Sequence, residues 1–269
     1  MKHSPGHYFT PQCVVDLSHS SYQTNHQSAV CNPEAITVLS WNIYKTRKQN
    51  ALADLRQFSH QHDLLILQEA HLGDELEAIF VENDLHWTMN TAFIYHKKAT
   101  GVLIASRVKA VDSYGLRYKE PLIRLPKTTL INFYPIANSS RTLLVANIHS
   151  INFTLGTTVY NRQLHELISV ISQHDGPVII AGDFNSWSRA RLFLLQTMQK
   201  KLHLHTLDES TDMDNVQSND YGRHHKTRIF GNELDHIFYR GLEPINKKIW
   251  PVDSSDHNPI QVCFRLNQN

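Results

Sequence analysis

The sequence has little of what would place it in a specialised class of protein. Its 269 residues contain only three cysteines, Cys13, Cys31 and Cys263, and no Cys-x-x-Cys pair. These are too few and too scattered for a disulfide framework, and they form no cysteine-based zinc motif. The formal net charge is only +1. No global field therefore draws the protein toward nucleic acid or acidic membranes, and any recognition of phosphate has to be local.

Long hydrophobic runs are also missing. The first thirty residues contain no uninterrupted apolar run of the kind found in signal peptides. No later window approaches the length of a membrane span. We therefore expect a cytoplasmic protein without membrane anchoring, and we take it to be a monomer.

What is present is an ordinary globular composition, with 41% hydrophobic and 19% charged residues. Residues 1–34 are rich in His, Ser, Gln and Asn, and they predict a poorly ordered N-terminal arm. No repeat or linker divides residues 35–269, which we expect to form one domain.

Strand and helix signals alternate along that domain. Apolar runs such as ITVLSWNI, LLILQE and PVIIAGDF are typical of buried strands. Helices are predicted over 48–60, 74–83, 158–174 and 188–201, the last with Ser188 as its N-cap. Further strands are predicted at 87–95, 101–107, 129–136, 141–149, 234–241, 245–250 and 260–266, and a long polar loop at 205–232. This order favours a mixed α/β fold in which two packed β-sheets are flanked by helices.

Polar residues gather where the apolar strands begin or end. They are Asn42 in WNI, Glu69 in LQE, His149 in NIH, Asp183 and Asn185 in GDFN, Asp235 in ELDHI, and Asp256 and His257 in SSDHNP. Loops at strand ends are where a rigid scaffold presents catalytic groups. The pattern therefore indicates a functional site.

Each motif alone has an ordinary structural explanation. A glutamate after a buried strand is often a cap or an ion-pair partner, and Asn42 or GDFN would fit a plain turn. Asp-His-Asn-Pro could simply start a loop, because Pro259 restricts the residue before it to extended conformations. Only the combination of motifs, in this order, favours a site.

In that order the motifs resemble the endonuclease/exonuclease/phosphatase superfamily, which includes DNase I-like nucleases, apurinic endonucleases, sphingomyelinases and inositol polyphosphate phosphatases. The likeness runs from Ile36 onward. It is closest to the bacterial YafD-like branch, through LSWNIYK, LLILQEA, NIHSINFTLG, GPVIIAGDFNSWSRAR, LDHIFYRGL and SDHNP. It implies a DNase I-like four-layer sandwich and metal-dependent cleavage of a phosphoester. One departure is Tyr44, where many members place a charged residue.

The resemblance implies a metal site made of oxygen ligands, which hard Mg²⁺ or Mn²⁺ would suit. Glu69 would bind the metal directly, with Asn42 beside it. Asp256 would contribute through water or at a second position.

The resemblance also assigns the catalytic roles. Asp183 would position and deprotonate the attacking water, and Asn185 would hold a phosphate oxygen. His257 would stabilise the phosphate while Asp235 fixes its tautomer. His149 would stabilise or protonate the leaving group. Which histidine is the acid and which the base stays open.

The sequence indicates the residues that would contact the substrate less clearly than the metal and catalytic residues. Asn152 matches a phosphate-contacting asparagine in part of the superfamily, but it would also suit a cap before the helix at Thr158. Arg189 is the basic residue that we expect at the substrate. The run RHHKTR at 223–228 fits either a phosphate contact or a solvated loop, and Trp187 fits either base stacking or packing on the next helix.

Together these residues predict a phosphodiesterase, and nucleic acid is one candidate substrate. A phosphomonoesterase or a phospholipase would share the same metal and histidines. A non-catalytic phosphate-binding module would be expected to have lost some of these site residues. A zinc protein built from the 18 histidines is a third idea, but no His-x-x-x-His pair lies on a convincing helix.

Overall fold

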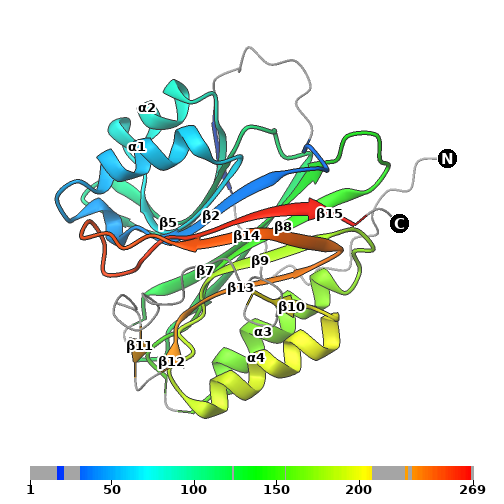
Figure 1. Ribbon diagram of the computed structural model, residues 1–269. Coiled ribbons are helices and arrows are strands. Elements are labelled where there is room, and N and C mark those ends of the chain that lie inside the picture. The colour runs from blue at the N-terminus through cyan, green and yellow to red at the C-terminus, as the bar shows by residue number, and fades with distance from the viewer. Residues whose placement is uncertain are drawn as a thin grey trace.

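The computed structural model describes residues 17–20, 31–122, 124–154, 156–207, 228–229 and 232–267. These residues form two sheets packed face to face, with a pair of helices on the outer side of each (Figure 1). The predicted four-layer sandwich is confirmed. None of the described helices is long and apolar enough to cross a membrane.

The first sheet has seven strands in the order β1-β4-β5-β3-β2-β15-β14. Its strands are β1 (Ser18–His19), β2 (Ile36–Asn42), β3 (Leu64–His71), β4 (His86–Tyr95), β5 (Lys98–Ser106), β14 (Leu242–Ile249) and β15 (Ile260–Leu266). Only β2 and β3 pair in parallel, which places their carboxyl ends side by side. Helices α1 (Ala51–Gln61) and α2 (Asp74–Glu82) cover the outer face.

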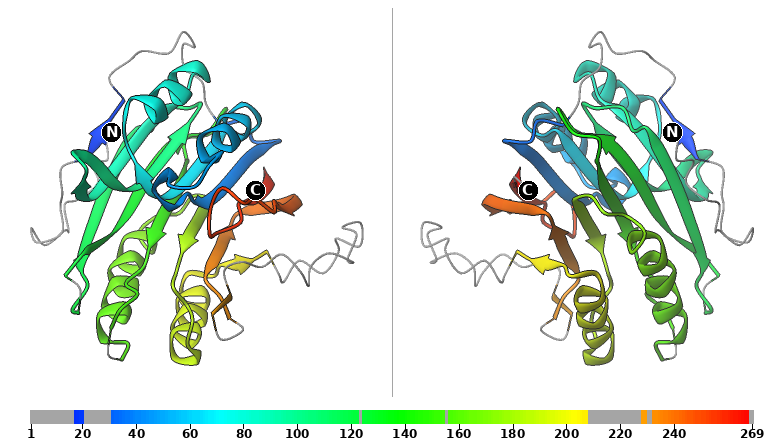
Figure 2. Two further views of the ribbon diagram at one scale, coloured as in Figure 1. Left: turned by 90° about the vertical axis from the view of Figure 1, so that its left-hand side faces the viewer. Right: turned by 90° about the vertical axis from the view of Figure 1, so that its right-hand side faces the viewer.

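The second sheet has six strands in the order β10-β13-β9-β8-β7-β6. Its strands are β6 (Asp112–Lys119), β7 (Pro126–Pro135), β8 (Thr142–His149), β9 (Val178–Asp183), β10 (His205–Thr206) and β13 (Asp235–Arg240). Here β8 and β9 form the parallel pair. Helices α3 (Thr158–Ile171) and α4 (Arg189–Leu202) cover this sheet, as the two side views in Figure 2 also show. The Ser188 hydroxyl accepts a hydrogen bond from the Arg191 amide, so the predicted N-cap is confirmed.

The core follows from the two-residue period of the strands. Val38 on β2 points between the sheets and packs in one cluster with Val145 and Ile179 of the second sheet. Its neighbour Leu39 points outward and packs in the cluster with Phe58 of α1. Both faces of the central strands are therefore apolar, which explains why their sequences are continuous hydrophobic runs rather than alternating ones.

Several segments differ from the sequence prediction. Strand β6 was not predicted, because DSYGLRYK is polar and the strand lies at the edge of its sheet, bonded only to β7. The first helix begins at Ala51 rather than at residue 48, because Asn50, directly before it, has a left-handed φ of 67°. Residues 44–46 form a 3-10 turn, η1 (Tyr44–Thr46).

The predicted loop at 205–232 contains β10 and the short hairpin of β11 (Arg228–Ile229) and β12 (Asn232–Glu233). Residues 208–227, with most of RHHKTR, lie outside the described residues. So does most of the predicted N-terminal arm, although Ser18 and His19 pair with β4 and Cys31 bridges to Ile136.

Candidate active site

The strand-end motifs meet at one edge of the sandwich, which faces the viewer in the left-hand view of Figure 2. In the parallel pairs, Asn42 lies beside Gln68, and His149 lies beside Asp183. The antiparallel strand β13 then places Asp235 opposite Asp183. Residues far apart in the sequence are thus brought together by the register of the two sheets.

Three of the predicted residues form what we call the Asp–His–Asp cluster: Asp183, Asp235 and His257. The Nδ1 atom of His257 lies 2.7 Å from Oδ2 of Asp235. Its Nε2 atom, on the other side of the ring, lies 3.9 Å from Oδ2 of Asp183. From the other side, Nε2 of His149 lies 3.5 Å from the same Asp183 oxygen. Asp183 therefore sits between two imidazole rings.

The electrostatics of the cluster follow from its burial. Burial alone would lower the pKa of His257, but the carboxylate of Asp235, helped by those of Asp183 and Asp256, outweighs it and raises that pKa to about 10. Burial raises the pKa of Asp183 to about 6, although the charge of His257 opposes the shift. At neutral pH the cluster thus holds a cationic imidazole next to a carboxylate basic enough to take a proton.

Asp183 is fixed by its neighbours. Its Oδ1 accepts a hydrogen bond from the Asn185 amide at 2.9 Å, and its Oδ2 accepts one from Nδ2 of Asn42 at 3.2 Å. Gly182 precedes it with φ of 143°, and a Cβ there would lie 2.0 Å from the carbonyl oxygen of Ile148. The glycine of GDFN is therefore required by the close approach of β8, and not only by a turn.

Glu69 projects from an irregular point of β3. The pairing of β3 with β5 shifts register between Leu67 and Ala70, and Glu69 has a left-handed φ of 52°. A buried amide pair lies beside this bulge. Gln68 Nε2 donates to Asn147 Oδ1 at 2.8 Å, and Asn147 Nδ2 donates to the Leu67 carbonyl at 2.9 Å. The asparagine of the NIH motif thus links the second sheet to the strand segment that carries Glu69.

Two lysines join the site, and neither of them was among the predicted site residues. Lys45 in the η1 turn forms an ion pair with the Glu69 carboxylate. Lys127, at the start of β7, places its Nζ atom 2.5 Å from Nε2 of His149. The charge that Tyr44 lacks is therefore supplied by the next residue, because the turn has left-handed φ values at residues 44–46.

The contact between Lys127 and His149 fixes the protonation of both groups. Burial, reinforced by the charge of Lys127, holds the pKa of His149 well below its usual range. Burial also lowers the pKa of Lys127, against the attraction of Asp183, Glu69 and Glu120. Both pKa values are lowered, and that of lysine starts far higher than that of histidine, so we assign the shared proton to Lys127. His149 is then neutral, with Nε2 as the acceptor.

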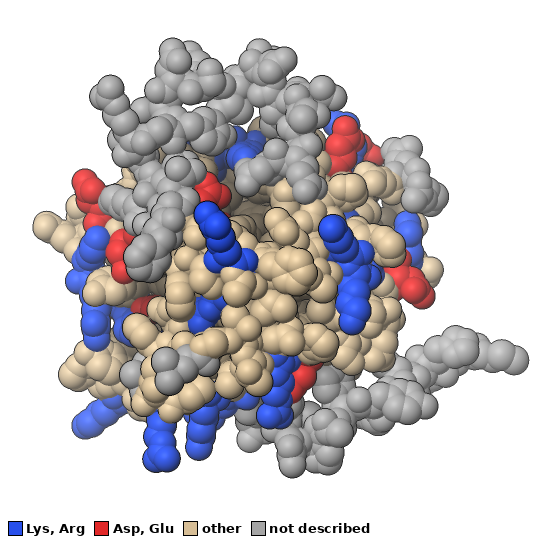
Figure 3. All heavy atoms as spheres, turned by 90° about the horizontal axis from the view of Figure 1, so that it is seen from below, with Lys and Arg blue, Asp and Glu red and all other residues tan. Residues whose placement is uncertain are grey.

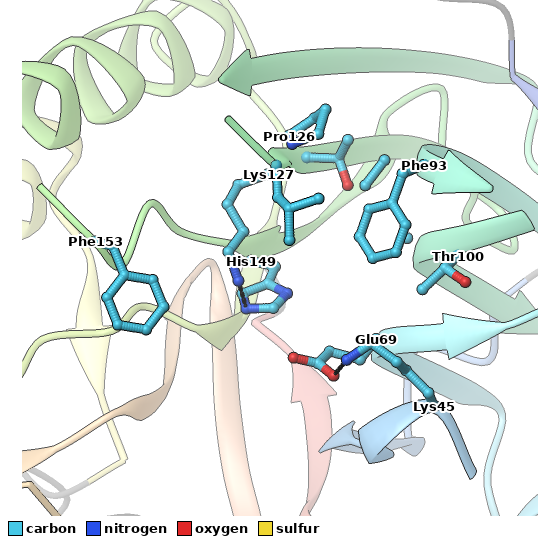
Figure 4. A pocket seen from close by; sticks show the side chains of 12 residues that line it. Lys45, Glu69, Phe93, Thr100, Pro126, Lys127, His149 and Phe153 are labelled. Carbon is cyan, nitrogen blue, oxygen red and sulfur yellow. Dashed lines mark hydrogen bonds and ion pairs between the residues drawn. The ribbon is translucent and has the colours of Figure 1, made fainter. Parts of the chain in front are cut away.

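A cavity of about 200 Å³ opens beside this contact (Figure 4). Lys45 and Glu69 come together on one side of it, and Lys127 reaches toward His149 on another. The rings of Phe93 and Phe153 lie on opposite sides of the Lys127–His149 contact. Further apolar wall comes from Ala92, Leu125 and Pro126.

Asn152 does not cap α3, which begins after Thr157. Its Oδ1 accepts a hydrogen bond from Trp187 Nε1 at 3.1 Å, so only its amide nitrogen is left to donate to a phosphate. Trp187 in turn packs on the guanidinium of Arg191 in α4. This agrees with the second alternative for Trp187, packing on the next helix.

Of the three remaining predicted residues, two lie at the surface and one is buried. Arg189 is exposed on the first turn of α4, and Asp256 is exposed beside Ser255. Asn185 is buried, and its Nδ2 donates to the Ser150 carbonyl at 2.9 Å. The predicted roles of these three residues toward a substrate or a metal stay predictions.

The donor set around Glu69 fits a hard divalent cation. A carboxylate and the amide oxygen of Asn42 are the ligand types that Mg²⁺ or Mn²⁺ prefers, and Mg²⁺ usually takes one or two carboxylates, several waters and the substrate phosphate. Within the described residues, no group of three or more His, Cys, Asp or Glu side chains is placed to hold a metal. The site therefore suits a loosely held, hydrated ion better than a closed zinc cage. Lys45 competes with such an ion for the same carboxylate.

The two-sheet sandwich, with its buried Asp–His–Asp cluster at one edge, defines a DNase I-like protein. The chain belongs to the Endonuclease/Exonuclease/phosphatase family, whose model matches residues 39–257. The predicted resemblance is thereby confirmed.

Individual relatives agree with this assignment. A UPF0294 protein of Vibrio campbellii is 41% identical over 235 residues, covering 86% of this chain and 78% of that protein. A UPF0294 protein of Yersinia enterocolitica is 38% identical over 232 residues, covering 86% and 84%. Among solved structures, the human Nocturnin catalytic domain with bound sulfate aligns with a TM-score of 0.66 at 19% identity, covering 89% of this chain and 97% of that one. This last likeness concerns the fold alone.

Proposed function

We propose that the protein is a metal-dependent phosphodiesterase that hydrolyses its substrate by in-line attack of a water activated by Asp183. The observation that carries this proposal is the environment of Asp183. Its carboxylate is buried, has a pKa raised to about 6, and lies between His149 and His257. A base poised near neutral pH beside a cationic imidazole suits proton removal from water at a phosphate.

The residues divide the work as follows. His257, kept charged by Asp235, attracts the phosphate oxygens. Asp183 accepts the proton of the attacking water, and Asn42 holds that carboxylate in place. A Mg²⁺ or Mn²⁺ ion bound at Glu69 would supply charge neutralisation at the phosphate.

A diester is favoured over a monoester by the cavity next to the cluster. A phosphodiester carries an organic group on each side of the phosphorus, and the apolar wall formed by Phe93, Leu125 and Phe153 offers room for one of them. Nucleic acid remains the substrate that we would test first. The predictions of a cytoplasmic location, of a monomer and of no membrane anchoring rest on the sequence alone and stay predictions.

The test is hydrolysis of a panel with Mg²⁺ or Mn²⁺ and with EDTA. The panel contains single-stranded and duplex DNA, RNA, bis-p-nitrophenyl phosphate, p-nitrophenyl phosphate and a soluble inositol phosphate. We expect metal-dependent turnover of diesters in preference to monoesters. Hydrolysis that is insensitive to EDTA, or that is confined to monoesters, would contradict the proposal.

A further inference from the structure

Building on the proposed phosphodiesterase activity, we propose that the cavity in Figure 4 is the leaving-group subsite and that Lys127 is a catalytic residue at its base, where its ammonium group stabilises the departing oxygen. The subsite takes a compact apolar or aromatic alcohol.

The position of the cavity relative to Asp183 sets the direction of the reaction. Asp183 and Lys127 both contact Nε2 of His149, which lies 3.5 Å from the Asp183 carboxylate and 2.5 Å from Lys127 Nζ. In-line displacement places the attacking water and the leaving oxygen on opposite sides of the phosphorus. If the water is held at Asp183, the leaving oxygen points toward the cavity. The cavity is lined by Lys127 and His149 but not by Asp183 or His257.

Charge at the base of the cavity suits a developing alkoxide. Burial lowers the pKa of Lys127, whereas the carboxylates of Asp183, Glu69 and Glu120 favour its charged form, and its Nζ atom lies against Nε2 of the neutral His149. His149 has no proton on Nε2 to give to a leaving group in this arrangement. Lys127 is therefore the cation on the His149 side of the cavity, with His149 as the residue that positions it.

The proposed step balances in atoms and charge. Water adds to phosphorus and gives one proton to Asp183, while the bond between phosphorus and the leaving oxygen breaks and leaves its electron pair on that oxygen. Lys127 donates a proton to the oxygen, so that the alcohol departs neutral. The proton on Asp183 then returns to Lys127 through solvent, and the enzyme is restored.

The walls of the cavity define the organic group. Phe93, Leu125, Pro126 and Phe153 present apolar surface, and the volume of about 200 Å³ is below the 300–1,000 Å³ typical of ligand pockets. A single ring or a short alkyl group fits this space. Alcohols of this kind are poor leaving groups, which is the case in which a positioned cation matters most.

The test of Lys127 uses methyl aryl phosphodiesters in which only the leaving phenol changes, from 4-nitrophenol through 4-chlorophenol to phenol. We expect Lys127→Met to lose little activity with the 4-nitrophenyl ester, whose anion needs no help, and about 10²–10³-fold with the phenyl ester. Lys127→Arg should keep the shallow dependence of the wild type. Lys45→Met is the matched control, since it removes a lysine of the same cavity on the Glu69 side. Whatever rate it retains, its dependence on the leaving group should match the wild type.

A loss of equal size across the series in folded Lys127→Met would overturn the role of Lys127.

A second measurement tests the apolar wall without changing Lys127. Leu125→Ala, at the exposed rim, should raise KM for the 4-nitrophenyl ester about tenfold while leaving competitive inhibition by dimethyl phosphate unchanged. Equal effects on both compounds would refute the subsite. If the wild type cleaves no diester, the proposed function fails first; if it does and only these differences are missing, this inference alone fails.

Discussion

His257 and Asp183 hold opposite charges 3.9 Å apart in a setting from which water is largely excluded. Such a pair is costly to bury unless each group has further partners. Asp235 supplies the partner for His257, while the Asn185 amide and Asn42 supply those for Asp183. The chemistry of the site therefore depends on single contacts that can be removed one at a time.

Replacing Asp235 by asparagine removes the main charge that raises the pKa of His257 to about 10. The pKa of His257 should fall, so His257 loses its proton as pH rises through the new, lower value. We expect kcat/KM to fall about 10²–10⁴-fold near neutral pH, and the alkaline limb of the pH profile to move to lower pH because His257 loses its proton earlier. The measurement is a pH profile of wild type and Asp235→Asn. A profile of unchanged shape would contradict the role of Asp235.

His62, at the end of α1, predicts an acid sensitivity that is unrelated to catalysis. Burial lowers its pKa from the ordinary 6.5, and its Nδ1 contacts the Phe58 carbonyl. Below pH 6.5 the unfolded chain binds a proton that the folded protein resists, so stability present above that pH is lost as the pH falls toward the lowered folded pKa.

We therefore expect His62→Gln to show a smaller drop in Tm than the wild type between about pH 7.5 and 5.5. The exposed neighbour His60 serves as the control, and His60→Gln should follow the wild type. Parallel Tm curves for all three proteins would count against a buried neutral His62.

At the scale of secondary-structure elements, Arg191 fastens α4 to the loops of the site. Its side chain is only 1% exposed. The guanidinium donates to the carbonyl oxygens of Ile151 and Asn185 at 2.8 Å and of Asn152 at 2.7 Å, and it lies over the rings of Trp187 and Tyr160. One buried cation thus ties together the two segments that follow β8 and β9.

Arg191→Met should leave these carbonyl groups without a donor and destabilise the protein by about 2–4 kcal/mol. It should also lower kcat, because Asn185 and Asn152 lose their support. Urea unfolding measures the first effect. Arg189→Met, an exposed change in the same helical turn, should alter stability by less than about 0.5 kcal/mol. Equal effects of the two substitutions would refute the role of Arg191 in holding α4 against the loops of the site.

The elements that carry the motifs were predictable from the sequence, because β2, β3 and β9 are buried on both faces and therefore appear as continuous apolar runs. The edge strand β6 was not predictable, since it lacks that pattern. The two lysines of the site, Lys45 and Lys127, were not predictable either. The contacts of Lys45 with Glu69 and of Lys127 with His149 join residues 24 and 22 positions apart, and they depend on a left-handed turn and on sheet register that no local pattern records.

The whole molecule carries little net charge. On the face shown in Figure 3, basic and acidic side chains are interspersed with uncharged surface, in keeping with the net charge of +1. The cations that would meet a phosphate are instead local, and Lys45, Lys127 and His257 all lie at the edge where the two sheets present their strand ends. Membership of the family establishes the fold, whereas the activity has to be argued from this edge.

The proposed phosphodiesterase activity is tested by metal-dependent hydrolysis of bis-p-nitrophenyl phosphate by the wild type, Glu69→Ala and Asp183→Ala, with thermal melts to confirm folding. We expect turnover with Mg²⁺ or Mn²⁺ that EDTA abolishes, and the loss of that turnover in both folded variants, because one lacks the metal ligand and the other the base. Full activity in either folded variant would refute the proposed roles of Glu69 and Asp183.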